Sequence, residues 1–182
     1  NQNMNSVRFS TFPKTTKPKD FAIDVVNVFQ SSIEQISTVD LHKGLDSDSV
    51  LSIVRKGLVN MGFEVENGKR KDDKVFRPVF YGENAQPTVK YEIDGFNSEF
   101  KCGIEVEAGR AWMGNAVYRD LVLGLVMVEL EHLILAVPQA YKYKSNGKDL
   151  ISRDYENAKN LIDTIFSHSR FQLPYDLTLI GY

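Results

Sequence analysis

The chain has 182 residues, of which 42% are hydrophobic and 25% charged, enough for one continuous core and too few to favour two domains. The formal net charge of −2 does not indicate a protein that coats nucleic acid, because nonspecific phosphate binding usually needs a marked basic excess. The single cysteine, Cys102, excludes an internal disulfide. With neither a membrane-spanning run nor a secretory leader in the sequence, the cytoplasm is the expected location.

The N-terminal part predicts a polar lead-in followed by two helices. Residues 1–19 are polar and contain two prolines, which predicts an extended arm ahead of a single domain over residues 20–182. Apolar residues at helical spacing predict an amphipathic helix over residues 21–36. A second helix should begin near Ser47 and end at Gly62, where a left-handed C-cap is expected.

The pattern after this point changes to that of strands. A short strand over residues 63–66, a turn at Asn67-Gly68 and a return strand over residues 75–81 are expected. Two further strands should cover residues 89–95 and 100–108, around a turn near Asn97.

The C-terminal part alternates helices and strands. Residues 115–132 contain a run, residues 121–128, that is apolar nearly all round and predicts a buried helix, at whose end His132 would lie. An interior strand over residues 133–137, a helix over residues 158–166 and a last strand over residues 177–180 follow. The order of elements predicts a mixed α/β domain, with a central mixed sheet flanked by helices.

Two of the predicted strands carry acids on one face. Side chains alternate along a strand, so Glu105 and Glu107 should share the face opposite the apolar one. Glu92 and Asp94 should share the corresponding face of the preceding strand. Because a short turn joins the two strands, up to four carboxylates can meet on one surface of the sheet.

Crowded carboxylates repel one another unless a cation or a bound proton neutralises them. Oxygen ligands at this density suit Mg²⁺ or Mn²⁺, and such an ion can polarise a phosphodiester and activate a water molecule. The alternative is a solvated strand face on which Lys90 and Lys101 pair with the acids.

The acids also follow the pattern of a known family. Ile93-Asp94, ten intervening residues and Glu105-Val106-Glu107, with a helix before and a helix and strand after, resemble the core of PD-(D/E)xK nucleases. The resemblance runs from about residue 47 to residue 143. It implies a restriction-endonuclease-like fold and metal-dependent hydrolysis of phosphodiester bonds in DNA.

The resemblance assigns roles to particular residues. It implies that Asp94 and Glu105 bind Mg²⁺ or Mn²⁺ and that Glu107 is the third catalytic residue. That third position is usually a lysine, and Glu there resembles the BamHI and BglII kind of type II restriction endonuclease. Ile93 stands where the motif often has proline.

Two arginines near the acidic strand are candidate contacts to phosphate. Arg110 follows that strand and Arg119 lies early in the next predicted helix, and the guanidinium suits bidentate phosphate binding. An ordinary surface ion pair is the alternative for each. The basic run at residues 69–71 could touch a nucleic-acid backbone or form a solvated loop.

Several functions remain open at this point. The favoured one is a restriction-type nuclease acting on duplex DNA. The alternatives are a repair or recombination nuclease, a non-catalytic nucleic-acid-binding or interaction protein with the same core, and a small-molecule metalloenzyme. Cutting both strands of a duplex usually needs two sites, which predicts a homodimer. The expected dimer surfaces are the N-terminal arm, the first helix near Phe29 and Ile33, and residues 171–182.

Overall fold

The fold is built on a six-stranded mixed sheet. A computed structural model describes residues 6–182 of the chain, and its central sheet has the strand order β1-β10-β7-β6-β5-β2. Strands β6, β7 and β10 run parallel to one another, and the flanking strands pair antiparallel. The six strands are β1 (Arg8–Phe12), β2 (Glu64–Val65), β5 (Gly95–Asn97), β6 (Cys102–Val106), β7 (His132–Val137) and β10 (Asp176–Gly181).

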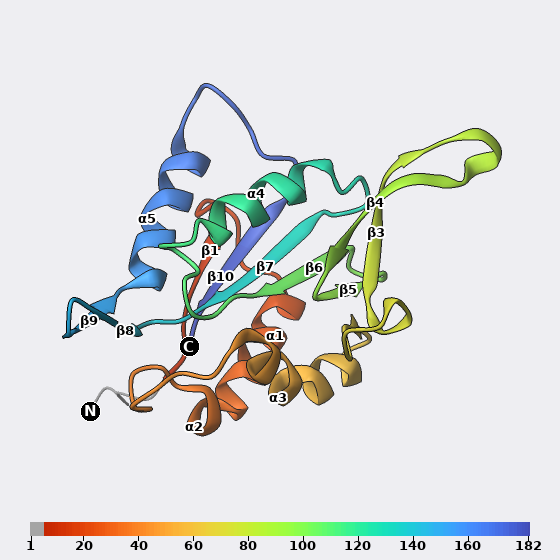
Figure 1. Ribbon diagram of the computed structural model, residues 1–182. Helices are drawn as coiled ribbons and strands as arrows, with labels where there is room; N and C mark the ends of the chain where they lie inside the picture. The colour runs from red at the N-terminus through yellow and green to blue at the C-terminus, as the bar shows by residue number, and fades with distance from the viewer. Residues whose placement is uncertain (1–5) are drawn as a thin grey trace.

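Helices cover both faces of this sheet (Figure 1). Helices α1, α2 and α3 lie against one face, and α4 and α5 lie against the other. All six residues of β7 are buried, as expected for a central strand that is covered on both sides. The helices are α1 (Asp20–Ser31), α2 (Ile33–Ile36), α3 (Ser47–Asn60), α4 (Ala116–Val126) and α5 (Asp154–Ser167).

Strand β6 divides its side chains between the two faces. Cys102, Ile104 and Val106 are buried in the core beneath α1 and α3, whereas Glu105 faces the side of α4. This is the alternation that the sequence predicts for the acidic strand. Burial of the apolar face fixes the register, because a shift by one residue would turn the carboxylate into the apolar core.

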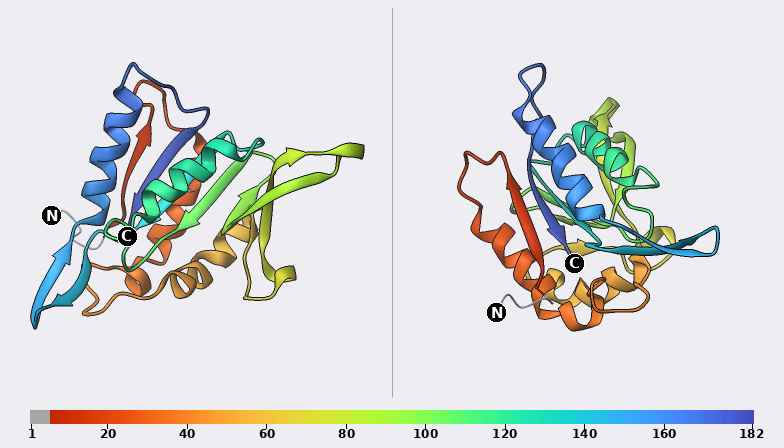
Figure 2. Two further views of the ribbon diagram at one scale, coloured as in Figure 1. Left: turned by 45° about the horizontal axis from the view of Figure 1, so that its top comes forward. Right: turned by 90° about the vertical axis from the view of Figure 1, so that its left-hand side faces the viewer.

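Two hairpins project from opposite ends of the molecule (Figures 1 and 2). One consists of β3 (Val75–Tyr81) and β4 (Pro87–Ile93), and the other of β8 (Tyr141–Ser145) and β9 (Lys148–Ser152). Short 3₁₀ turns at Lys71–Asp73 and Glu83–Ala85 precede β3 and β4. The first hairpin is joined to the central sheet at Asp94, which lies between β4 and β5.

The predicted mixed α/β class with a flanked central sheet is confirmed, with local differences. Part of the expected arm is strand β1, which pairs with β10 at the edge of the sheet; residues 1–5 of that arm lie outside the described part. Strand β3 pairs with β4, not with β2. The β8–β9 hairpin lies between residues 137 and 158, where the sequence analysis predicted no strand.

The predicted helical position of His132 is wrong. Helix α4 ends at Val126, and His132 is the first residue of β7. Its buried ring lies edge-on to Phe21, and Nε2 is 2.8 Å from the Thr178 hydroxyl. The histidine is therefore part of the sheet's packing. No helix within residues 6–182 has the length and apolarity needed to cross a membrane.

Candidate functional site

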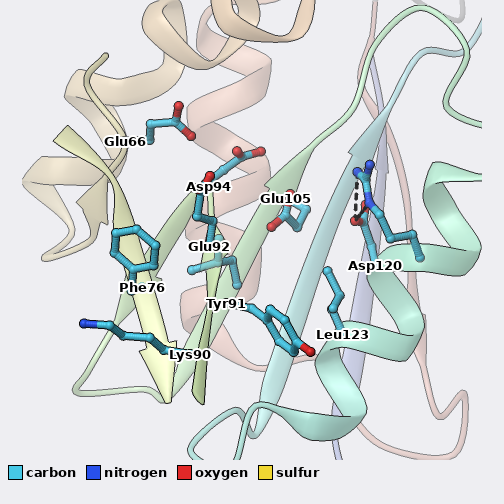
Figure 3. A pocket seen from close by; sticks show the side chains of 11 residues that line it. Glu66, Phe76, Lys90, Tyr91, Glu92, Asp94, Glu105, Asp120 and Leu123 are labelled. Atoms are coloured by element: carbon cyan, nitrogen blue, oxygen red, sulfur yellow. Dashed lines mark hydrogen bonds and ion pairs between the residues drawn. The ribbon is translucent and has the colours of Figure 1, made fainter. Parts of the chain in front are cut away.

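A pocket of about 490 Å³ opens between the β3–β4 hairpin, β6 and helix α4. Figure 3 shows acidic side chains reaching into it from several elements. Asp94 and Glu105 approach from the strands, and Asp120 approaches from α4. Glu66, which follows β2, and Glu92 of the hairpin line the same pocket. Residues far apart in sequence thus bring their carboxylates to one surface.

Asp94 is held by hydrogen bonds to the chain on both sides. Its carbonyl accepts the N–H of Glu66 at 2.8 Å, and its Oδ2 accepts the N–H of Val106 at 2.8 Å. The next residue is Gly95, where a Cβ atom would lie only 2.8 Å from the Ile104 side chain. Strands β5 and β6 can approach closely there, which brings the Asp94 carboxylate beside Glu105.

Glu105 occupies the centre of the acidic group. Figure 3 shows its carboxylate between Asp94 and Asp120. Carboxylate oxygens of Glu105, Glu107 and Asp120 all lie within 4.8 Å of one another, while Asp94 interacts with Glu105 from the hairpin side. The structure therefore brings the three acids that the sequence singled out to one site, and it adds a fourth.

The sequence analysis missed Asp120. Its segment was interpreted as a helix apolar nearly all round, yet Asp120 is only 2% exposed and lies on the buried face of α4. Its neighbours on that face are Val117, Leu121 and Gly124. This spacing at positions i, i+3, i+4 and i+7 was a readable signal that the acid faces inward.

Arg119 is the basic residue that pairs with the acids of the site. It donates to Glu107 Oε1 at 2.7 Å and to Asp120 Oδ1 at 3.3 Å, and it lines the pocket. The lysines of the alternative interpretation contact other groups: Lys90 lies over the Phe76 ring and Lys101 pairs with Glu131. Lys90 lines the same pocket as the acids, but within residues 6–182 the ion pairs of the site are those of Arg119.

The other basic candidates lie outside the pocket. Arg110 is exposed in the segment between β6 and α4 and is not among the residues that line the cavity. In the basic run at residues 69–71, Lys69 pairs with Asp48 at 2.6 Å. A phosphate contact by either group remains a prediction.

The acids disfavour their own ionisation. Burial, followed by the charges of Glu107 and Glu66, raises the pKa of Asp94 to about 6, against the opposing hydrogen bond from Val106. Burial and the neighbouring charges, that of Asp94 foremost, raise the pKa of Glu105 well above its ordinary value. Burial and Glu107 raise the pKa of Asp120 to about 9. At neutral pH the group holds protons or requires a cation.

The donor set fits a hard divalent cation. All of the converging ligands are carboxylate oxygens, which suit Mg²⁺ or Mn²⁺. Among the buried side-chain atoms of residues 6–182, Asp120 Oδ2 is one that has no hydrogen-bond partner, although buried polar atoms are generally paired. Asp94 and Glu105 could hold one ion, with Asp120 and Glu107 next to them.

Comparison with known proteins supports the fold. The restriction endonuclease BglII in complex with a DNA 16-mer superposes with a TM-score of 0.52 at 12% sequence identity, over 97% of this chain and 77% of that one. The chain has a restriction-endonuclease-like fold. Free BglII gives a TM-score of 0.48 at 13% identity, over 97% and 78% of the two chains. The sequence matches no protein-family model and no curated protein.

Proposed function

We propose that the chain is a divalent-metal-dependent nuclease that hydrolyses phosphodiester bonds in duplex DNA, in the manner of a type II restriction endonuclease. The observation that carries this proposal is the half-buried pair of carboxylates, Asp94 and Glu105, in a pocket of a restriction-endonuclease-like fold. The superposed BglII structure is a complex with DNA, which supports DNA as the substrate class. A cytoplasmic location is part of the same proposal.

Asp94 and Glu105 would hold Mg²⁺ or Mn²⁺. When bound, the ion would polarise the scissile phosphate and lower the pKa of a water molecule. The Val106 N–H and the backbone bond to Glu66 fix the direction of the Asp94 carboxylate, and partial burial of both acids reduces the solvent screening of an ion bound there.

Glu107 stands where related nucleases usually have lysine. The site still has a positively charged side chain, which comes from Arg119. Arg119 of α4 donates to the Glu107 carboxylate at 2.7 Å. Because the Arg119 side chain is 59% exposed at the mouth of the pocket, its remaining N–H groups can contact a phosphate. We therefore assign Arg119 to substrate phosphate and Glu107 to orienting the guanidinium or a water molecule.

A cleavage assay tests the proposal. Purified chain is incubated with phage genomic DNA of high sequence complexity, plasmid, single-stranded DNA and RNA, with Mg²⁺, Mn²⁺ or a chelator. We expect metal-dependent cutting of duplex DNA and its loss in Glu105→Gln, because the amide is a poor metal ligand. Asp163→Asn, which removes an exposed carboxylate paired with Lys14, is the matched control and should cut normally.

Two outcomes favour the alternatives. Absence of cutting on every substrate, together with metal-independent DNA binding, favours a non-catalytic binding protein. Cutting confined to single strands or to branched DNA favours a repair or recombination nuclease. Full activity of Glu105→Gln would contradict the assigned mechanism.

A homodimer is the assembly that this function needs, and the structure changes where we propose its interface. Phe29 and Ile33 lie in the core, and so does Tyr182, so the first helix and the last strand are poor candidates, whereas Phe171 at the start of the predicted C-terminal surface is 51% exposed. Helix α4 instead exposes a row of apolar side chains at helical spacing. The row consists of Tyr118, Val122, Leu125 and Val126, followed by Val128.

A further inference from the structure

A second cavity, of about 210 Å³, lies between helix α3 and the turn that follows β2. Glu66 lines both this cavity and the acidic pocket. Its N–H donates to the Asp94 carbonyl at 2.8 Å, and Figure 3 shows its side chain on the far side of Asp94 from Asp120. One water molecule needs roughly 10–15 Å³ of such a cavity, so a phosphate group fits here, next to the acids.

Arg55 is the side chain of this cavity whose charge has no partner among residues 6–182. Its Nε is buried and forms no hydrogen bond, although buried polar atoms are generally paired. Among the same residues its terminal nitrogens form neither a hydrogen bond nor an ion pair, and the side chain lines the cavity. A guanidinium has five N–H donors in a planar fork and no acceptor, so an anion with several oxygens is the ligand that it lacks.

The two acids of the cavity already have cations of their own. Asp48 accepts from Lys69 Nζ at 2.6 Å, and Glu66 pairs with Lys74. The positive charge of Arg55 is therefore the one that no carboxylate lining the cavity balances. An anion bound there would meet little repulsion from Asp48 or Glu66, because each of these charges is compensated.

The turn beside the cavity continues with further basic residues. Arg70 and Lys71 are exposed and directly follow the lysine that lines the cavity. Asp72 and Asp73 come next, but neither lines the cavity, and the Asp73 carboxylate lies against Gly68 on the same turn. A DNA strand, with its row of phosphates, suits a guanidinium with exposed basic side chains beside it better than a single small anion does.

We propose that Arg55 binds a backbone phosphate of the DNA strand that is cut, on the α3 side of the scissile phosphate. The scissile phosphate would lie at Asp94 and Glu105. The strand then reaches Arg55 by passing Glu66, whose charge Lys74 balances. The planar fork of the guanidinium can hold two oxygens of one phosphate. The inference rests on the proposed nuclease function and deepens it, because it names where the strand is held beside the reacting bond.

The salt dependence of duplex binding tests the proposal. Binding of a fluorescent duplex is measured by anisotropy with Mg²⁺ at several salt concentrations, in the Glu105→Gln chain, which should not cut. Arg55→Gln, Arg55→Lys and the control Lys56→Gln are each added to that chain. The control removes the same charge from an exposed residue of α3 that does not line the cavity.

Each lost phosphate contact lowers the slope of log affinity against log salt concentration by about 0.9. We expect Arg55→Gln to lose this much slope and to bind the duplex at least about tenfold more weakly at low salt. Arg55→Lys should keep the slope, because it keeps the charge, but bind less tightly, because it loses the fork. Lys56→Gln should match its parent chain.

A second measurement identifies phosphate as the ligand and separates its sources. At equal ionic strength, replacing chloride by inorganic phosphate should raise the Tm of the parent chain and of Lys56→Gln more than that of Arg55→Gln. The comparison between variants removes the general stabilisation that phosphate gives to folded proteins. The Tm values in chloride show whether Arg55→Gln folds normally.

The outcomes separate this inference from the proposed function. An unchanged salt slope in Arg55→Gln, or an equal loss of slope in Lys56→Gln, overturns the role of Arg55 and leaves the nuclease proposal to the cleavage assay. Absence of duplex binding, with a phosphate effect that depends on Arg55, assigns the cavity to free phosphate and contradicts DNA as its source. Absence of both effects contradicts both proposals. If Arg55→Gln folds poorly, a loss of slope in Arg55→Lys overturns the proposal independently.

Discussion

Replacing Asp94 by asparagine should stabilise the metal-free protein at high pH. The pKa of Asp94 rises from 3.8 to about 6 on folding, so the folded state binds its proton more tightly than the unfolded state does. The contribution of this group to stability is therefore complete below pH 3.8 and is lost as the pH rises through 6. The loss is about 1 kcal/mol at pH 4.5 and about 3 kcal/mol at pH 8.

The asparagine variant avoids this loss but weakens one hydrogen bond. Its amide oxygen can still accept from the Val106 N–H, now 2.8 Å from the carboxylate, at a cost of about 1 kcal/mol for the lost charge. The net gain expected for Asp94→Asn is then about 2 kcal/mol at pH 8 and close to zero at pH 4.5. For a chain of 182 residues, this gain raises the Tm by roughly 4–8 °C.

Urea unfolding in the presence of a chelator, at pH 4.5 and pH 8, measures this difference. Added Mg²⁺ should stabilise wild type at pH 8 and have much less effect on the variant, because ligand binding to the folded state adds stability. The control Asp163→Asn should show no gain that depends on pH. A variant less stable than wild type at pH 8, or equally shifted at both pH values, would refute the reasoning.

Three further predictions concern other parts of the molecule. Gly95→Ala should destabilise the fold by about 1–3 kcal/mol in urea unfolding, because the new Cβ would lie 2.8 Å from Ile104. Burial lowers the pKa of His132 from 6.5 to about 4, so its contribution to stability is present above pH 6.5 and lost as the pH falls through 4. The variant His132→Gln should therefore lose less stability than wild type when the pH falls from 6.5 to 4. Val122→Glu, at a position 58% exposed, should convert a dimer seen by light scattering to a monomer at an unchanged Tm, and a monomeric wild type would contradict the proposed interface.

The alternation of side chains along the acidic strand β6 was sufficient to predict which of its residues reach the site. Alternation along β6 required Glu105 to face away from the apolar core that contains Ile104 and Val106, and the structure has this arrangement. The burial of β7 also followed from its continuous apolar run. Local pattern suffices in such strands because one buried face leaves a single acceptable register.

Long-range pairing could not be predicted in the same way. Strand β1 lies in a segment that was predicted to be an extended arm, and it becomes a strand because β10, more than 160 positions later, offers it a sheet edge. The turn at residues 67–68 was expected to join β2 to a return strand over residues 75–81. In the structure β2 instead pairs with β5, which follows Asp94. By contrast, the β8–β9 hairpin had a local signal, since Asn146 and Gly147 both adopt positive φ as an Asn-Gly turn requires.

Asp94 is also a mechanical joint. It is the single residue between β4, which belongs to the projecting hairpin, and β5, which belongs to the central sheet. Its carbonyl and its carboxylate accept hydrogen bonds from Glu66 and Val106 on the sheet side, so these two bonds oppose a rotation of the hairpin about Asp94. The base of the hairpin therefore lies in the acidic pocket, and any change in the angle between the hairpin and the sheet would move the Asp94 carboxylate relative to Glu105.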